Sequence, residues 1–217
     1  MTENADDRLI VPGSTILILF LTLLVVIPVA TWRMSRGLAS PLVEVVTLVQ
    51  GEDHFRGRWK IGKYEYLIGQ EQDGASSRDS VRLTIRESGQ SDSISSSTTD
   101  RDGTIESVMF LDPDGDRFNA AVVAIRRPDE NATLQLLLYN FTSSGDPASG
   151  EWSDMTRIPP HLAIGYYGHD SIERQSEMVV RTFPIYREDD GKLQATGQTR
   201  SLIWNFSTGR WRPDPRK

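Results

Sequence analysis

The chain has 217 residues and no cysteine. This absence excludes a disulfide framework, thiolate metal sites and a cysteine nucleophile, and it is compatible with either redox compartment. Histidine is almost as scarce, because the sequence contains only three, His54, His161 and His169. These three are too scattered along the chain to suggest an imidazole metal cluster.

The chain also lacks an excess of positive charge. Its formal net charge is −6 at pH 7, whereas a nucleic-acid partner requires a basic face that neutralises phosphates. The acidic residues are spread through the chain, which is typical of an ordinary solvated surface. The composition therefore predicts no nucleic-acid partner.

One long apolar run lies near the N-terminus. No charged residue occurs from Leu9 to Trp32, and Ile16–Val29 is almost wholly aliphatic. At about 1.5 Å per residue, this run is long enough to cross a hydrocarbon core of about 30 Å. It predicts an uncleaved single-pass transmembrane anchor at Leu9–Trp32, after a polar tail at residues 1–8 and before a juxtamembrane linker at residues 33–55.

A cleaved signal peptide is the alternative interpretation of this run. The acidic N-terminal tail is unlike the basic start of a signal peptide, and the apolar run is longer than usual for one. Counting basic residues, with Arg33 and Arg36 after the run and Arg8 and the terminal amine before it, leans only slightly towards a cytoplasmic C-terminal domain.

Beyond the anchor, the sequence pattern indicates strands. Apolar residues alternate with polar ones at Tyr64–Ile68 and Val81–Ile85, which suits strands with one buried face. Further strands are predicted at Leu134–Phe141, Met178–Tyr186 and Leu202–Phe206. Because no helical apolar period extends over ten or more residues, the sequence predicts an all-β class.

We expect a β-rich soluble domain at residues 56–213, with possible strand groups at 56–141 and 155–213. The expected polar connectors are Gln70–Asp79, Ser88–Asp102 and Thr142–Asp154. The apolar stretch Gly37–Gly51 is compatible with either a short helix or a first strand.

The stretch Arg101–Ile125 has the strongest hairpin pattern of the chain. Two β-rich runs flank Asp112–Asp116, where proline presets φ and glycine tolerates positive φ. We expect antiparallel strands at Ile105–Leu111 and Ala120–Ile125, central in a sheet. The side chains expected to be most buried are Ile105, Val108, Phe110, Val122 and Ile125.

Two sets of motifs carry a family resemblance. The stretch Arg101–Val108, followed by Phe110 and the acidic turn, resembles the hallmark of periplasmic inhibitors of I-type (invertebrate-type) lysozyme. The stretches Gly168–Ser171, Arg181–Tyr186 and Thr196–Arg200 are similar to a pattern in related envelope proteins. The resemblance implies an antiparallel β-sandwich exported to the bacterial periplasm, and so favours a periplasmic C-terminal domain. Together with the anchor predicted from the apolar run, which lies outside the resemblance, this places the chain at the inner membrane.

The same family carries a Ser/Gly-rich loop that ends in tyrosine and inserts into the lysozyme cleft. The corresponding stretch here is Arg126–Thr133, which contains a proline and two carboxylates but no tyrosine. Because function resides in loops grafted on a fold, the fold can be shared without the activity. We therefore expect a non-catalytic interaction domain, such as an accessory subunit of a membrane complex, with a lysozyme inhibitor of altered loop as the alternative.

Candidate sites are few. Asp112, Asp114 and Asp116 have the spacing of the first three ligands of a calcium loop, although a solvated turn is the simpler interpretation. His169 is expected to be a turn residue, and no catalytic triad or nucleophile elbow is evident. An envelope glycan hydrolase using Glu106 with a turn aspartate is the third and weakest hypothesis. The aromatic residues expected to pack in the core and at its rim are Tyr166, Tyr167, Trp204, Phe206 and Trp211.

The anchor prediction can be tested by charge insertion. Replacing Leu19 and Leu23 together by arginine should release the protein from the membrane, because each arginine costs about 2.5–3.5 kcal/mol at the centre of a spanning helix. Membrane fractionation measures the effect. Recovery of the natural protein with an N-terminus near Ser40 would instead show that the segment is a cleaved signal peptide.

Overall fold

The computed structural model describes residues 43–50, 55–72, 79–112, 120–141 and 150–216. The chain divides into two compact units, Met1–Ala30 and Thr31–Lys217, and all of these residues belong to the second. They contain thirteen strands and no helix, which confirms the all-β prediction for this part of the chain. In these ranges no helix has the length and apolar character that crossing a membrane requires, and the predicted anchor lies outside them.

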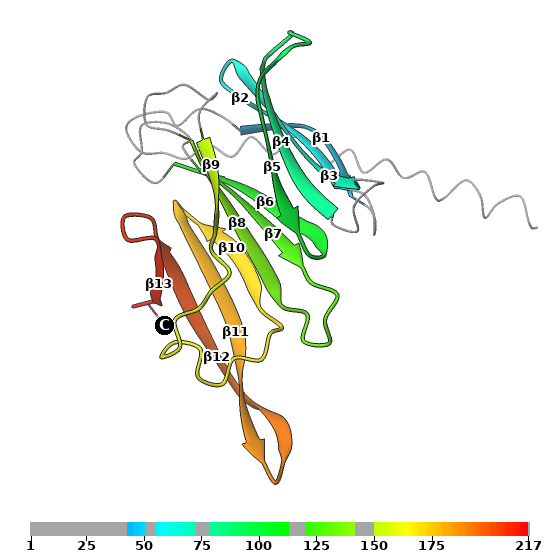
Figure 1. Cartoon of the computed structure of the whole chain (residues 1–217). Helices are drawn as coiled ribbons and strands as arrows, with labels where there is room; N and C mark the ends of the chain where they lie inside the picture. The colour runs from blue at the N-terminus through cyan, green and yellow to red at the C-terminus, as the bar shows by residue number, and fades with distance from the viewer. Residues whose placement is uncertain (1–42, 51–54, 73–78, 113–119, 142–149, 217) are drawn as a thin grey trace, which may run out of the picture. The chain divides into compact units, whose positions relative to one another are not determined.

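The strands form three antiparallel sheets (Figure 1). The N-terminal sheet contains β1 (Val43–Gln50), β2 (Phe55–Ile61), β3 (Tyr64–Gln72), β4 (Asp79–Glu87) and β5 (Ser93–Arg101), in that order. The middle sheet contains β6 (Thr104–Leu111), β7 (Ala120–Arg126), β8 (Leu134–Phe141) and β9 (Gly150–Asp154). The C-terminal sheet contains β10 (Ser171–Gln175), β11 (Met178–Asp189), β12 (Lys192–Asn205) and β13 (Arg210–Pro213).

The two central strands of the middle sheet, β7 and β8, are buried on both faces. Along β7, odd-numbered residues from Ala121 to Ile125 belong to a core shared with the N-terminal sheet, and even-numbered residues from Ala120 to Ala124 belong to a core shared with the C-terminal sheet. The strand β8 divides its side chains between the two cores in the same way. Two buried faces explain why β7 is almost wholly apolar and shows no polar alternation.

Aromatic rings fill both cores. In the first, Phe110 lies 5.4 Å from Trp59 and 5.4 Å from Tyr66, measured between ring centroids. In the second, Trp204 and Trp211 meet edge to face at 5.2 Å. Such tilted and edge-to-face pairs add to the free energy gained by burying the rings.

The predicted hairpin forms. The strands β6 and β7 pair antiparallel, with Ile105 opposite Ile125 and Phe110 opposite Ala121, and these four side chains are buried. Val108 is less buried than predicted, because β6 is an edge strand of the middle sheet rather than a central one. It is therefore β7 that is central, where Val122 is fully buried.

Two predicted connectors contain strands. The Ser/Thr-rich stretch Ser88–Asp102 includes β5, which pairs with β4 along its length, and Thr142–Asp154 includes β9, which pairs with β8. Alternate residues of β5 are half-buried against the first core, where small or β-branched side chains suit an edge position. The stretch Gly37–Gly51, for which the sequence allowed a helix or a strand, contains the strand β1, which pairs with β2. The predicted juxtamembrane linker at residues 33–55 therefore includes a strand of the N-terminal sheet.

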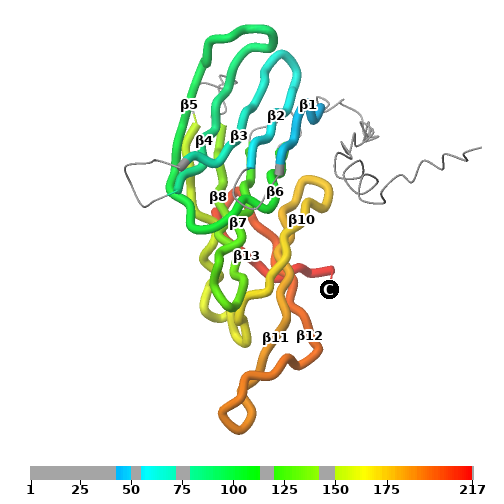
Figure 2. Tube along the Cα trace, turned by 90° about the vertical axis from the view of Figure 1, so that its right-hand side faces the viewer, coloured from blue at the N-terminus to red at the C-terminus, as the bar shows by residue number. Residues whose placement is uncertain are grey.

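The C-terminal sheet carries a long two-stranded extension, residues 187–199 of β11 and β12, which we call the arm (Figure 2). All of its residues are exposed. Its tip is a two-residue turn in which Asp190 and Gly191 have φ of 48° and 69°, the geometry that matches the twist of a hairpin. A bulge between Pro184 and Tyr186 marks its base, and bulges commonly redirect a strand.

The first core predicts the effect of a large-to-small change. Phe110→Ala removes a ring that contacts Trp59 and Tyr66 and should lower the free energy of unfolding by about 3–5 kcal/mol. Ile94→Ala is the matched control, because Ile94 is 42% exposed. Urea unfolding followed by tryptophan fluorescence compares the two variants. Equal effects would contradict the assignment of Phe110 to the core.

Candidate interaction site

The two motif regions singled out in the sequence converge on the turn at residues 127–133, between β7 and β8. Gly103 has φ of 128°, and a Cβ there would lie 2.1 Å from the carbonyl oxygen of Arg126. Gly168 has φ of 85°, and its Cβ would lie 2.1 Å from the carbonyl oxygen of Asn131. Both positions therefore require glycine for space as well as for backbone conformation.

Arg126 joins these regions at the end of β7. Its Nε donates to Glu106 Oε2 at 2.9 Å, and its Nη1 donates to the carbonyl oxygens of Ala132 at 2.6 Å and Asp170 at 2.9 Å. One guanidinium thus connects β6, the turn and the segment before β10. Glu106 is held in an ion pair, in agreement with a structural role for this carboxylate.

The turn also fixes its own polar groups. The backbone amide of Thr133 donates to Asp129 Oδ1 at 3.0 Å, and the amide of Arg127 donates to the Thr133 carbonyl oxygen at 3.0 Å. The hydrogen bond from the Thr133 hydroxyl group lowers the pKa of Asp129. In the lysozyme-inhibitor resemblance this stretch corresponds to the inserting loop, whereas here it folds back on itself.

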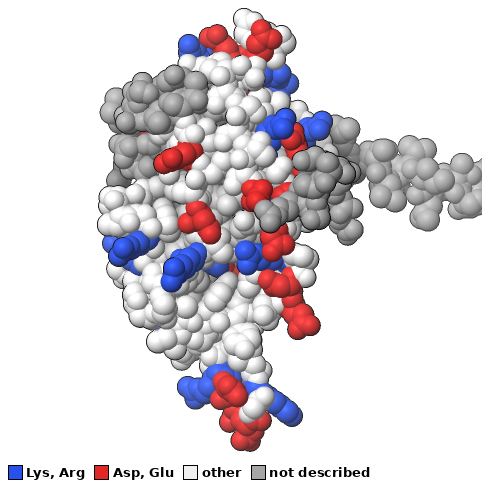
Figure 3. All heavy atoms as spheres, viewed as in Figure 1, with Lys and Arg blue, Asp and Glu red and all other residues white. Residues whose placement is uncertain are grey.

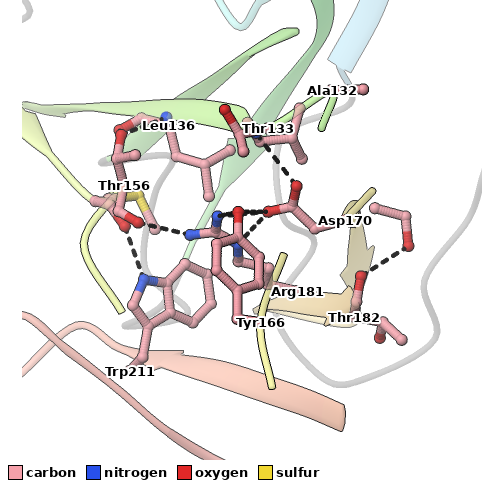
Figure 4. A network of polar contacts seen from close by, with 12 residues as sticks. Ala132, Thr133, Leu136, Thr156, Tyr166, Asp170, Arg181, Thr182 and Trp211 are labelled. Atoms are coloured by element: carbon pink, nitrogen blue, oxygen red, sulfur yellow. Dashed lines mark hydrogen bonds and ion pairs between the residues drawn. The ribbon is translucent and has the colours of Figure 1, made fainter. Parts of the chain in front are cut away.

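A buried ion pair lies next to the turn (Figure 4). Arg181 of β11 is 1% exposed and Asp170 is 2% exposed. The Nε atom of Arg181 donates to Asp170 Oδ2 at 2.6 Å, its Nη1 donates to the Thr156 carbonyl oxygen at 2.7 Å, and its Nη2 donates to the Tyr166 hydroxyl oxygen at 2.9 Å. The guanidinium is therefore bonded on all three nitrogens.

Asp170 is satisfied to the same degree. Its Oδ2 also accepts from the Tyr166 hydroxyl group at 3.2 Å, and its Oδ1 accepts from the backbone amide of Leu134 at 3.2 Å. Burial raises the pKa of Tyr166, so this hydroxyl group keeps its proton and acts as a donor. A buried pair with every group bonded fixes geometry, and removing one partner leaves an uncompensated charge.

This network holds the long connection from β9 to β10. The indole of Trp211 donates to the Met155 carbonyl oxygen at 2.7 Å, at the start of the connection. Further along, Arg200 of β12 donates to the Leu162 carbonyl oxygen at 2.7 Å, and the amide of Tyr186 donates to the Gly165 carbonyl oxygen at 2.9 Å. The connection is therefore fastened to the strands of the C-terminal sheet at both ends.

The fastened connection presents apolar side chains to solvent beside the base of the arm. Ile164 is 68% exposed and Tyr167 is 48% exposed. The ring of Tyr186 lies 6.1 Å from that of Tyr167 and 6.2 Å from that of His169. We call these four residues the arm-base patch. Exposed aromatic and aliphatic groups on an immobilised backbone are typical of protein-binding surfaces.

The predicted packing of the aromatic residues is correct for most of them. Trp204 and Trp211 are buried in the second core, and Phe206 is partly buried against that core. Tyr166 is partly buried in the polar network. Tyr167 departs from the prediction, because it points to solvent. His169 lies in the irregular segment before β10 and has a positive φ of 53°.

The proposed calcium ligands are only partly described. Asp112 is buried at the end of β6, and its backbone amide donates to Glu177 Oε2 at 2.8 Å. Asp114 and Asp116 lie outside the described residues, so calcium binding at this turn stays a prediction. Among the residues that the structure describes, no cluster of three histidine, cysteine or acidic side chains is arranged to hold a metal ion.

A second charged cluster crosses the outer face of the N-terminal sheet. Glu65 accepts from Arg58 at 2.6 Å, from Arg86 at 2.8 Å and from the Ser88 hydroxyl group at 3.2 Å. The hydrogen bond from Arg58 lowers the pKa of Glu65 to about 2, and Arg86 acts in the same direction. The carboxylate is therefore ionised at neutral pH and bonded to both cations, which suits joining three strands better than transferring protons.

Sequence reasoning missed the Arg181–Asp170 pair although a signal was present. Arg181 follows Val179 and precedes Phe183 at a spacing of two, so a strand places all three on one face. Val179 and Phe183 are fully buried in the second core. A charged residue between two core positions indicates a buried charge, which must have a partner.

Comparison with family models, with curated proteins and with solved structures finds no match to this chain.

The buried pair yields a double-mutant prediction. Asp170→Ala should lower the free energy of unfolding by about 3–5 kcal/mol, because Arg181 is left buried and unpaired. Combining Asp170→Leu with Arg181→Met should restore much of this loss, since no charge is then buried. The control is Glu87→Gln, which breaks the exposed ion pair with Lys63 and should change stability by less than about 1 kcal/mol.

Urea denaturation of the three variants measures these differences. A loss below about 1 kcal/mol for Asp170→Ala would contradict the stabilising role of the Arg181–Asp170 ion pair. A double variant that is less stable than Asp170→Ala would contradict it too.

Proposed function

We propose that this chain is a membrane-anchored periplasmic interaction domain without catalytic activity, an accessory subunit that docks on a larger membrane complex. The arm-base patch and the arm form the surface that contacts its protein partner. The observation that carries this proposal is the exposure of Ile164 and Tyr167 on a connection whose backbone is fastened by Arg181, Arg200 and Tyr186.

Preorganisation is the first argument for a binding role. Association loses free energy when loops and side chains must be ordered, so a backbone fixed in advance binds more tightly for the same contacts. Tyrosine is among the residues that contribute most to protein interfaces when they are buried centrally. Tyr167 and Tyr186 present two such rings side by side.

The arm supplies a second argument. A two-stranded ribbon without a covering layer is marginally stable in water, and a partner that covers one of its faces would stabilise it. The sequence from Arg187 to Lys192 carries both signs of charge, and Figure 3 shows basic and acidic side chains side by side at the tip. Mixed charge at a projecting tip favours selection of a partner with a complementary pattern.

The membrane tether and the periplasmic location rest on the sequence. The apolar run Leu9–Trp32 supports the anchor, and the motif resemblance supports export. A tether raises the local concentration of the domain at a membrane partner, so that a moderate patch suffices for stable docking.

Lysozyme inhibition is less well supported. The stretch Arg126–Thr133 would have to insert into the enzyme cleft, yet Arg126 and Asp129 use their charged groups on internal hydrogen bonds. Because this exposed turn is fixed by its own hydrogen bonds, the arm-base patch is the better supported contact surface.

Affinity purification of the full-length chain in mild detergent, followed by mass spectrometry, tests the proposal. The double variant Ile164→Asp, Tyr167→Ala should recover at least about tenfold less of the partner, because it removes two exposed contact residues. The control is Ile94→Asp, which alters an exposed aliphatic residue of β5. Equal partner recovery with all three proteins, at equal thermal stability, would contradict the proposed surface.

A further inference from the structure

Among the residues that the structure describes, β1 is an apolar edge strand. It is the first strand of the N-terminal sheet, and in the described part of the chain it pairs with β2 alone. The exposed fractions are 50% for Val45, 40% for Val46, 44% for Leu48 and 54% for Val49. Proteins ordinarily protect an edge of this kind with lysine, proline or a covering segment, and the sequence VEVVTLVQ contains neither lysine nor proline.

A bulge in β1 determines which of its residues share a face. The register with β2 shifts between Val45 and Thr47, so Val46 is the extra residue. Val45 lies opposite Trp59 and Leu48 lies opposite Gly57. Since residues opposite one another share a face and Trp59 belongs to the first core, Val45 and Leu48 both lie on the core side.

The other side of β1 follows the same reasoning. Glu44 lies opposite Lys60, and Val49 lies opposite Arg56. Both therefore lie on the outer face of the sheet. In a regular strand, residues an odd number of positions apart lie on opposite faces; the bulge removes this restriction for pairs that span Val46.

We propose that β1 pairs antiparallel with β1 of a second copy of this chain, with Val45 opposite Leu48 and Glu44 opposite Val49. The two-fold axis then passes between Val46 and Thr47. In this register Val45 and Leu48 meet on the core side of the joined sheet, and Glu44 and Val49 meet on its outer side. A register centred on Val46 would place Val45 opposite Thr47, which lies on the outer face opposite Arg58. That register is excluded by the pleat.

Charge also fits a second copy as the occupant. Glu44 is the one charged residue of β1, and the proposed register places it opposite an uncharged valine. Like charges directly opposite one another would be destabilising, and the two Glu44 side chains are instead separated by about 16 Å, five residues at about 3.3 Å each. Valine and leucine meet on the core side, where they extend the first core.

The backbone argues for a strand rather than lipid as the occupant. Hydrocarbon would leave the amide and carbonyl groups of the free edge without hydrogen bonds, whereas a second β1 satisfies them. Residues 33–42 separate the apolar run from β1, a reach of at most about 35 Å. If the anchor of the proposed function holds, both copies are confined to one plane, which raises the effective concentration for pairing; the register itself does not depend on the anchor.

Cysteine cross-linking tests the register directly, because the natural chain has no cysteine. Glu44→Cys and Val49→Cys are made in separate full-length chains with different tags, coexpressed, extracted in mild detergent and oxidised with copper phenanthroline. Directly opposed residues of antiparallel strands have Cα separations of about 4.5–5.5 Å, within the range that a disulfide spans. We expect a disulfide-linked dimer that carries both tags.

The matched controls are each variant oxidised by itself and Glu44→Cys coexpressed with Leu193→Cys, an exposed position in the arm. Each should yield at least about tenfold less dimer. Equal cross-linking in all pairs would show random collision and overturn the proposal, and so would dimers from Glu44→Cys alone, which a parallel pairing predicts. Absence of the mixed dimer would also overturn the proposal. In that case a bimane fluorophore attached to Val49→Cys would be tested with spin-labelled lipid, and quenching of its fluorescence would assign the strand to the bilayer surface.

Discussion

The constraint on which this structure depends is that the middle sheet has two apolar faces. The strand β7 places Val122 in one core and Val123 in the other, and both side chains are fully buried. A strand of this composition would expose one row of aliphatic side chains in a two-layer structure. The N-terminal and C-terminal sheets each cover one face, so neither can be removed without exposing a core.

The candidate interaction site follows from this arrangement. The connection from β9 to β10 links the middle sheet to the C-terminal sheet, and its backbone polar groups need partners where it passes over buried strands. Arg181 of β11 supplies one such partner by donating to the Thr156 carbonyl oxygen, and it also bonds Asp170 at the end of the connection. Asp170 in turn accepts from the Leu134 amide of the middle sheet. Because the backbone of the connection is fixed, the side chains of Ile164 and Tyr167 stay exposed to solvent.

Much of the fold could be predicted from local pattern. The alternation in Tyr64–Ile68 and Val81–Ile85 correctly indicates two adjacent strands with one buried face. The predicted strands β6 and β7 pair antiparallel, in agreement with the apolar runs on which the prediction rests. These features depend on residues that are close together in the sequence, so the local pattern of apolar and polar residues predicts them.

The errors arise where tertiary context decides. The strand β5 has a composition usual for loops and is a strand because β4 offers an edge and small side chains fit against the core. The exposure of Tyr167 and the burial of its neighbour Tyr166 depend on where Arg181 lies across the sheet. Neither the spacing nor the composition of residues 155–170 predicts which of the two tyrosines is exposed. The position of Arg181 between Val179 and Phe183, in contrast, does indicate a buried charge.

Native-state hydrogen exchange followed by mass spectrometry tests the central claim that the doubly covered middle sheet is the most stable part of the domain. Amides that open only on global unfolding exchange last. Peptides covering Ala120–Arg126 and Leu134–Phe141 should therefore exchange last, and peptides from residues 187–199 should exchange early. Early exchange in Ala120–Arg126, or protection of the arm equal to that of β7, would contradict the account.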